Sequence, residues 1–118
     1  MATYSKVLLS DSTSGKNISV TGAATGAAVD IHDAVAGSSD IDEIWLYACN
    51  TSAADVVLTV EYGGTTDQDD YIETTLTADG GMTLVVPGLL LNGGLTIKAW
   101  AGSANVVNIN GYVNRITA

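Results

Sequence analysis

Short apolar runs with a period of two, each closed by turn residues, are the feature that most constrains this chain. In the segment 56–62, Leu58 and Val60 fall on one face, and Thr59 and Glu61 fall on the other. Such alternation is typical of a half-buried β-strand, and no segment longer than two turns has the helical period of about 3.6 residues. The pattern therefore predicts an all-β fold.

About eight runs of this kind follow one another, separated by segments rich in Gly, Asn, Asp and Ser. They are residues 16–21, 27–33, 43–50, 56–62, 71–77, 82–86, 95–99 and 105–116. The spacing predicts a single-domain β-sandwich, jelly-roll-like, over residues 16–118. We expect Pro87 and Gly88 to end the sixth run, and Gly111 to form a bulge in the last one.

Residues 1–15 precede the first run and are interpreted as an N-terminal extended arm. The arm carries an apolar triplet, Val7, Leu8 and Leu9, followed by a flexible polar stretch. An exposed triplet of this kind invites aggregation, so contact must order it. The contact lies either with the chain's own sheet edge or with a neighbouring subunit, and we favour the neighbour because added strands often join proteins. Val7, Leu8 and Leu9 are thus candidate partner-binding residues.

Charge excludes several classes of partner. The chain has 13 acidic and 4 basic residues and a net charge of −9. Nucleic-acid affinity depends on Lys and Arg contacts with phosphates, so we expect no nucleic-acid binding. The same charge opposes anionic membrane surfaces, and no apolar run reaches the roughly 20 residues of a membrane span. Residues 1–16 lack the pattern of a signal peptide, so we expect synthesis and folding in the cytoplasm.

Residues able to carry chemistry are few. His32 is the only histidine and has no further ligands at metal-site spacing, so we interpret it as an outward strand residue. Cys49, the only cysteine, is expected to be a buried small hydrophobe. No nucleophile and base converge, and we expect neither enzyme activity nor a cofactor or metal.

The acidic loop 63–70 is the best ligand candidate. Asp67, Asp69 and Asp70 could bind calcium with carbonyl oxygens, but the spacing departs from the EF-hand pattern. We therefore predict an exposed, solvated loop that needs no metal.

Trp45 and Trp100 lie opposite the predicted inward sets of their strands and are candidate partner-binding residues. Outward aromatic residues mark contact surfaces. With Tyr62, Tyr71 and Tyr112 they could form an aromatic platform for sugars, or they could be the second face of a two-layer core.

Several stretches resemble the small virion proteins of tailed bacteriophages, above all the capsid decoration (cement) proteins. These stretches are residues 31–37, 42–50, 58–65, 84–89, 98–105 and 111–117. The resemblance implies a structural virion protein on the capsid exterior. It also implies a homo-oligomer, as a trimer, that clamps the major capsid protein and has no catalytic residues. The alternative is a glycan-binding or vertex- or tail-associated adhesion module, with Trp45 or Trp100 exposed beside Asn50 and Asp42.

Overall fold

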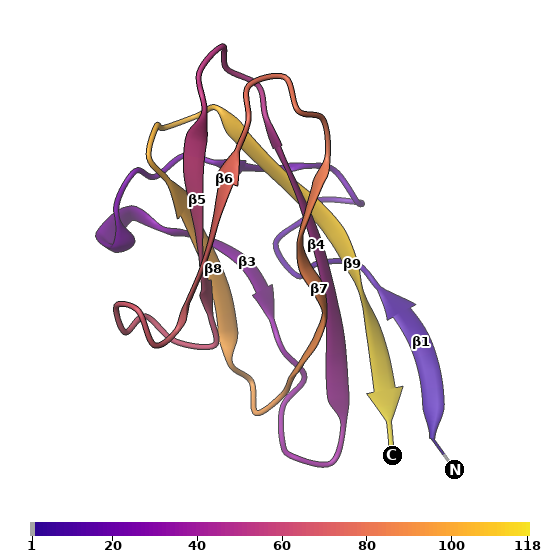
Figure 1. Cartoon of the computed structure of the whole chain (residues 1–118). Coiled ribbons are helices and arrows are strands. Elements are labelled where there is room, and N and C mark those ends of the chain that lie inside the picture. The colour runs from indigo at the N-terminus through magenta and orange to yellow at the C-terminus, as the bar shows by residue number, and fades with distance from the viewer. Residues whose placement is uncertain (1) are drawn as a thin grey trace.

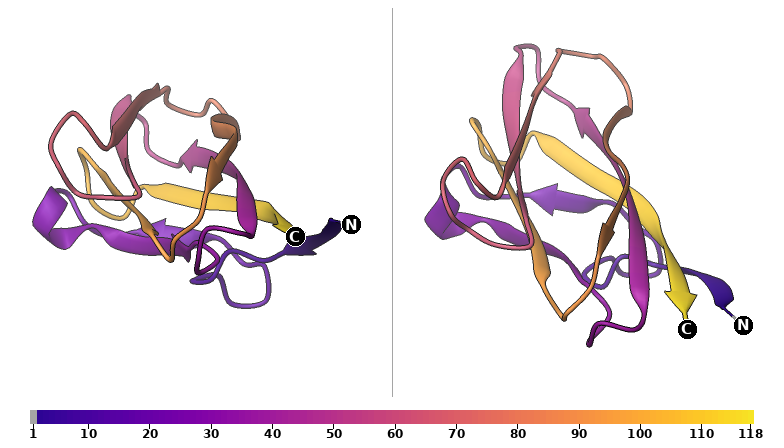
Figure 2. Two further views of the ribbon diagram at one scale, coloured as in Figure 1. Left: turned by 90° about the horizontal axis from the view of Figure 1, so that it is seen from below. Right: turned by 60° about the horizontal axis from the view of Figure 1, so that its bottom comes forward.

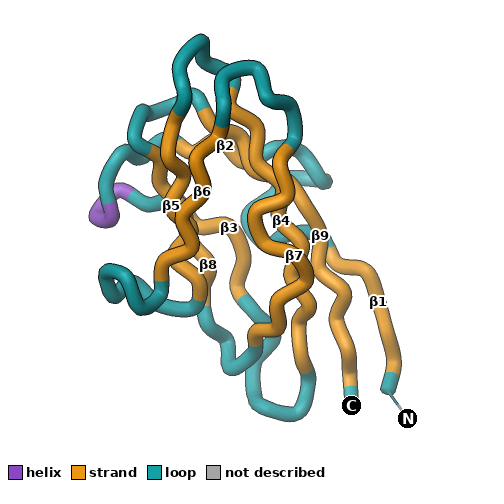
Figure 3. Tube along the Cα trace, in the orientation of Figure 1, coloured by secondary structure: helices purple, strands orange, loops and turns teal. Residues whose placement is uncertain are grey.

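The computed structural model describes residues 2–118, which form two antiparallel sheets packed face to face (Figure 1). Sheet A contains β1 (Thr3–Val7), β2 (Ile18–Val20), β4 (Ile41–Asn50), β7 (Thr83–Leu91) and β9 (Val107–Thr117). Sheet B contains β3 (Val29–Asp33), β5 (Val56–Tyr62), β6 (Tyr71–Leu76) and β8 (Thr96–Ala101). A single short 3-10 helix, η1 (Thr25–Ala27), lies among the loops drawn in Figure 3. Within the described part of the chain, no helix has the length and apolar character to cross a membrane.

The strand order identifies the type of sandwich. Sheet A has the order β1-β9-β4-β7, and sheet B has the order β3-β8-β5-β6. Both β1 and β2 pair with the same edge of β9: β1 pairs with its C-terminal half and β2 with its N-terminal end. With β1 and β2 taken as two parts of one edge strand, this is the order of an eight-stranded jelly roll. The prediction of a jelly-roll-like β-sandwich is confirmed, with β1 as a ninth strand segment.

The core lies between the sheets and is formed by the side chains that were predicted to face inward on both. Leu46 of β4 and Leu58 of β5 are completely buried, as are Ile44 and Ile97. Alternation produces this core because successive side chains of a strand point to opposite sides of its sheet. The jelly roll therefore leaves one outer face on each sheet.

The N-terminal segment belongs to the chain's own sandwich. Met1 lies outside the described residues, and β1 pairs with β9 from Thr3 opposite Thr117 to Val7 opposite Val113. Leu9 is only 1% exposed and packs in the core, whereas Leu8 remains exposed. Of the two contacts considered for the arm, the structure has the chain's own sheet edge, and Leu9 is not available to a partner.

Two expectations about strand interruptions are wrong. Pro87 and Gly88 do not end a strand, because β7 continues to Leu91 with register shifts against β4 before Trp45 and after Leu46. Proline is tolerated there because β7 is an edge strand. Gly111 forms no bulge against β4 and pairs regularly with Leu46; a Cβ at Gly111 would lie 2.0 Å from the carbonyl oxygen of Trp45. The close approach of the β4 backbone to Gly111, and not a bulge, explains why this position has no side chain.

Candidate interaction surface

The outer face of sheet A gathers aromatic, aliphatic and amide side chains from four strands. We define the sheet A outer face from the strand register and alternation as Tyr4, Lys6, Ile41, Glu43, Trp45, Tyr47, Cys49, Leu84, Pro87, Leu90, Asn108, Asn110, Tyr112, Asn114 and Ile116. Tyr4 is 71% exposed, and Leu84 and Leu90 are also exposed. Exposed apolar side chains gathered on one face mark an interaction surface.

Charge is distributed unevenly between the two sheets. The strands of sheet A contain Asp42 and Glu43 against Lys6 and Arg115, which leaves them without net charge. The strands of sheet B contain four acidic residues and one basic residue: Asp30, Asp33, Glu61, Glu73 and Lys98. The net charge of −9 therefore lies on sheet B and the loops. Sheet A is the part of the surface that another protein can approach without like-charge repulsion.

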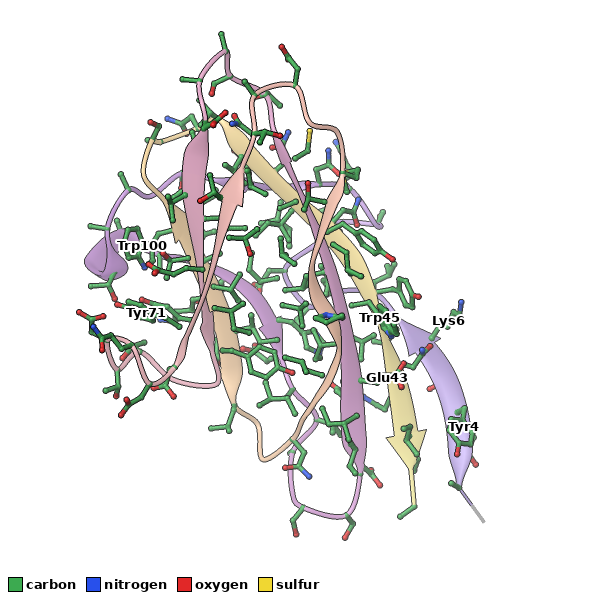
Figure 4. The ribbon with its side chains drawn as sticks, viewed as in Figure 1. Tyr4, Lys6, Glu43, Trp45, Tyr71 and Trp100 are labelled. Atoms are coloured by element: carbon green, nitrogen blue, oxygen red, sulfur yellow. The ribbon has the colours of Figure 1, made fainter. Side chains whose placement is uncertain are left out.

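Trp45 lies near the middle of the sheet A outer face and is held in place from several sides. Its indole crosses over Gly88, where a Cβ would lie 2.7 Å from the indole Cζ2. The ring stacks at 14° on Tyr112, with the centroids 6.2 Å apart, and Nε1 donates to Glu43 at 2.6 Å. A rigid, half-buried tryptophan of this kind is the usual energetic anchor of an interface. Figure 4 shows Trp45, Glu43, Lys6 and Tyr4 on the same side of the sandwich.

Glu43 is the only carboxylate of the sheet A outer face. Hydrogen bonds from the Trp45 indole and the Asn114 amide lower the pKa of Glu43. Both bonds end on Oε1, at 2.6 and 2.9 Å. Oε2 makes no hydrogen bond within residues 2–118, so this ionised oxygen is free to accept one from a partner.

The outer face of sheet B has its own tryptophan, Trp100, which is half-buried like Trp45 but is tied to a loop. Trp100 Nε1 donates to Glu61 Oε2 at 3.2 Å, Thr25 donates to the same oxygen, and Tyr71 packs edge-on against the indole. Glu61 and Thr59 lie opposite Leu58 and Val60, as predicted, and both are buried. They do lie on the outer side of sheet B, but the loop that carries Thr25 and the Trp100 ring cover this region.

His32 is completely buried, and the interpretation of an outward strand residue is wrong. A register shift between Asp30 and His32 makes Ile31 and His32 both face inward. The imidazole Nε2 lies 2.9 Å from Asp42 Oδ2, and Arg115 donates to both oxygens of Asp42. Burial raises the pKa of Asp42, but hydrogen bonds from Arg115, His32 and the Val35 N–H outweigh burial and lower it.

Ser10 completes a Ser–His–Asp series, and its geometry favours a structural role. Ser10 Oγ lies 2.9 Å from His32 Nδ1, but the Ser10 backbone N–H donates to the same nitrogen at 3.0 Å. Nδ1 is therefore an acceptor, and the proton lies on Nε2 toward Asp42. The Ser10 hydroxyl also accepts from the Asp33 N–H. These bonds fix the segment after β1 to β3 and β4.

The remaining candidates are exposed or half-buried. Cys49 is half-buried on the sheet A outer face opposite Asn108, which corrects the expectation of a buried thiol. Asp67 and Asp69 are exposed, and Asp70 accepts from the Thr66 N–H. Among residues 2–118, no three His, Cys, Asp or Glu side chains are grouped so that they could hold a metal ion.

Comparison of this chain with protein-family models, curated proteins and solved structures finds no match. Strand alternation alone places Trp45 and Trp100 on outer faces. It misses the association of Trp45 with Tyr112 and Asn114, which depends on the pairing of β4 with β9. The sequence contained one signal for this association: Tyr112 and Asn114 are two positions apart in the segment 105–116 and therefore share one face of that strand.

Proposed function

We propose that this protein is a structural virion protein, a capsid decoration or cement protein. In this proposal it attaches to the major capsid protein on the outside of a phage head through the sheet A outer face. The aromatic character of that face and its lack of net charge, on a chain of net charge −9, are the observation that carries the proposal. The specific assignment to a capsid rests on the resemblance of residues 31–117 to decoration proteins.

The physical argument is one of orientation. Association through the sheet A outer face would point sheet B and the acidic loops away from the shell and its enclosed DNA. Burial of Trp45, Tyr47, Leu84 and Leu90 would supply the apolar core that such interfaces need, and Glu43 and Lys6 would supply polar contacts near it. Many copies on one shell gain stability from repeated contacts without strong individual affinity.

Two matched variants test the face. Leu84 on sheet A is 43% exposed, and Val57 on the outer side of sheet B is 45% exposed, so an aspartate at either position perturbs folding to a similar extent. Leu84→Asp is expected to weaken co-sedimentation with capsids of the encoding phage by about tenfold or more, because it places an unpaired charge in the interface. Val57→Asp is expected to bind as wild type does. Equal binding by both variants would exclude this face, and absence of wild-type binding would exclude the function.

Glycan binding is the second candidate, and the setting of Trp45 favours it. A fixed indole beside the Asn114 amide and a carboxylate, one oxygen of which makes no hydrogen bond within residues 2–118, offers stacking and hydrogen bonds together. The expected polar neighbours were wrong, since Asn50 and Asp42 are buried on the inner side of β4.

A glycan array separates the two candidates. If the face binds sugars, wild-type hits disappear in Trp45→Ala and persist in Val57→Asp. An array without wild-type hits removes this candidate and leaves the capsid proposal untouched.

A further inference from the structure

The free edges of the two sheets differ in how well they are protected against pairing with another strand. Natural edge strands are protected by bulges, proline, charge or shortness. On sheet A, β7 carries Pro87 and two register shifts, and β2 has only three residues. On sheet B, β3 has a register shift and two aspartates, and β6 carries Glu73 after the acidic loop. These four edges all have a protective feature.

The edge formed by β1 has a single protective feature, the charge of Lys6. Its five residues pair with β9 in unbroken register, without proline or a carboxylate. Residues 3–6 are exposed, and β1 lies at the margin of the sandwich beside the C-terminal end of β9 (Figures 1 and 2). Lys6 is its only charged residue, and the Lys6 ammonium lies over the Tyr112 ring, 5.0 Å from its centroid.

We propose that β1 pairs with β1 of a second copy of this chain, antiparallel and about a two-fold axis. The two A sheets then join into one continuous sheet, and the two outer faces become one surface. This inference goes beyond the proposed function, because the pairing needs no capsid. It also differs from the resemblance, which implies trimers.

One register uses the whole strand. With Ser5 opposite Ser5 of the second copy, all five residues of β1 are paired, and Thr3 faces Val7 of the second copy. Tyr4 then faces Lys6 of the second copy on the outer side of the sheet. A register centred on Lys6 would instead place the two ammonium groups directly opposite each other, which is destabilising.

The favoured register adds a second aromatic ring to each ammonium. Lys6 already lies over Tyr112 of its own chain, and Tyr4 of the second copy would approach the same group. Cation–π contacts of this kind are favourable with tyrosine. The contact occurs twice in the symmetric pair, so its chemistry is self-complementary, as a two-fold interface requires.

Charge variants at these two positions test both the pairing and its register. Tyr4→Lys places two lysines opposite each other, and Lys6→Glu removes the cation. Each change is expected to raise the dimer dissociation constant about tenfold or more, because the contact it removes occurs twice. Sedimentation equilibrium of the full chain over a range of concentrations measures this constant, and circular dichroism checks folding.

A mixture of the two variants provides the sharper measurement. When a Tyr4→Lys chain pairs with a Lys6→Glu chain, the introduced lysine faces the introduced glutamate, and the native Lys6 of the first chain faces the native Tyr4 of the second. The mixture should therefore form heterodimers at concentrations where neither variant dimerises alone. Folding defects within each chain would give no such recovery. The double variant should likewise regain dimerisation, since each introduced lysine then faces an introduced glutamate of the other copy.

Leu84→Asp is the matched control on the opposite edge of the same sheet, and it should leave dimerisation unchanged. A wild-type chain that is monomeric at all concentrations, or trimeric, would overturn the proposal. So would a dimer that Tyr4→Lys does not weaken, or a mixture that stays monomeric. Loss of capsid binding in Tyr4→Lys without any wild-type self-association would assign the β1 edge to a capsid strand instead. Failure of capsid binding alone would leave the β1 proposal standing.

Discussion

The two tryptophans of this protein make the same contact in opposite surroundings. Trp45 on sheet A and Trp100 on sheet B each donate the indole N–H to a glutamate, Glu43 and Glu61 respectively. Glu43 is half-buried, and its Oε2 accepts no hydrogen bond from the part of the chain that the structure describes. Glu61 is fully buried beneath Thr25 and Trp100, and its Oε1 has no partner among residues 2–118.

This difference separates the candidate interaction surface on sheet A from a structural closure on sheet B. An unpaired carboxylate oxygen next to solvent is hydrated at no cost and can exchange water for a partner. An unpaired oxygen in the interior costs free energy, which the Thr25 and Trp100 hydrogen bonds must offset. Both tryptophans are half-buried, but sheet B uses Trp100 to fasten a loop, whereas Trp45 is held by residues of its own sheet.

Truncation of a buried leucine should destabilise the protein equally from either sheet, because the two inner faces form one core. The difference between the sheets is then confined to their outer faces. Leu46→Ala and Leu58→Ala each remove a fully buried leucine from the same core. Each is expected to lower the free energy of unfolding by about 2–5 kcal/mol. Urea denaturation measures both. A loss under about 1 kcal/mol for either would mean that its sheet is not packed as described.

The two glutamates should differ in their effect on stability. Glu61→Ala leaves the Thr25 hydroxyl and the Trp100 N–H without their buried acceptor, at an expected cost of about 1–3 kcal/mol. Glu43→Ala should cost less, because water can replace the carboxylate at Trp45 and Asn114. Thermal unfolding of the two variants side by side checks the order. The contrast between the sheets fails if Glu43→Ala is the more destabilising.

A pH titration examines the one charge cluster on the inner side of sheet A. The pKa of Asp42 is lower in the folded chain than its ordinary value, because Arg115, His32 and Val35 donate to it. Its contribution to stability is therefore complete above the unfolded-state pKa of about 3.9 and is lost as the pH falls through the lower, folded value. The stability difference between wild type and Asp42→Asn should shrink as the pH falls below about 4. A difference that stays constant with pH contradicts this account.

The smallest expected effect concerns the acidic loop between β5 and β6. Asp67 and Asp69 are exposed, so millimolar calcium should leave the melting temperature unchanged. A ligand that binds only the folded state must raise it. A rise of several degrees that Asp69→Asn abolishes would give sheet B a binding function and weaken its contrast with sheet A.

Alternation predicted the strands and the core because it records which side of a strand faces water. Trp45 lies on an outer face, and Leu58 and Val60 lie together on the opposite side from Thr59 and Glu61, as predicted. Alternation fails wherever a distant segment changes the surroundings. Glu61 has the spacing of an exposed residue, but the loop with Thr25 covers it.

Long-range pairing accounts for the other differences. His32 is buried because a register shift turns it toward Asp42, ten residues farther along the chain. Leu9 is in the core because β1 adds to β9, at the other end of the sequence. The composition of residues 1–15 is equally compatible with a neighbour's sheet. The sequence therefore placed Trp45 on an outer face but did not reveal the neighbours that hold it.

The pairing of β1 with β9 also bears on how the protein can be extended. Thr3 lies opposite Thr117, so the first and last described strands begin and end at one corner of sheet A, on adjacent strands roughly 5 Å apart. A fluorescent domain or an affinity tag fused to either end would emerge at that corner. A linker of a few residues from Ala118 to Ala2 would allow circular permutation, with new ends opened in the exposed loop between β5 and β6. In such a permutant, β9 and β1 would be joined as a hairpin, and β1 would remain at the edge of sheet A.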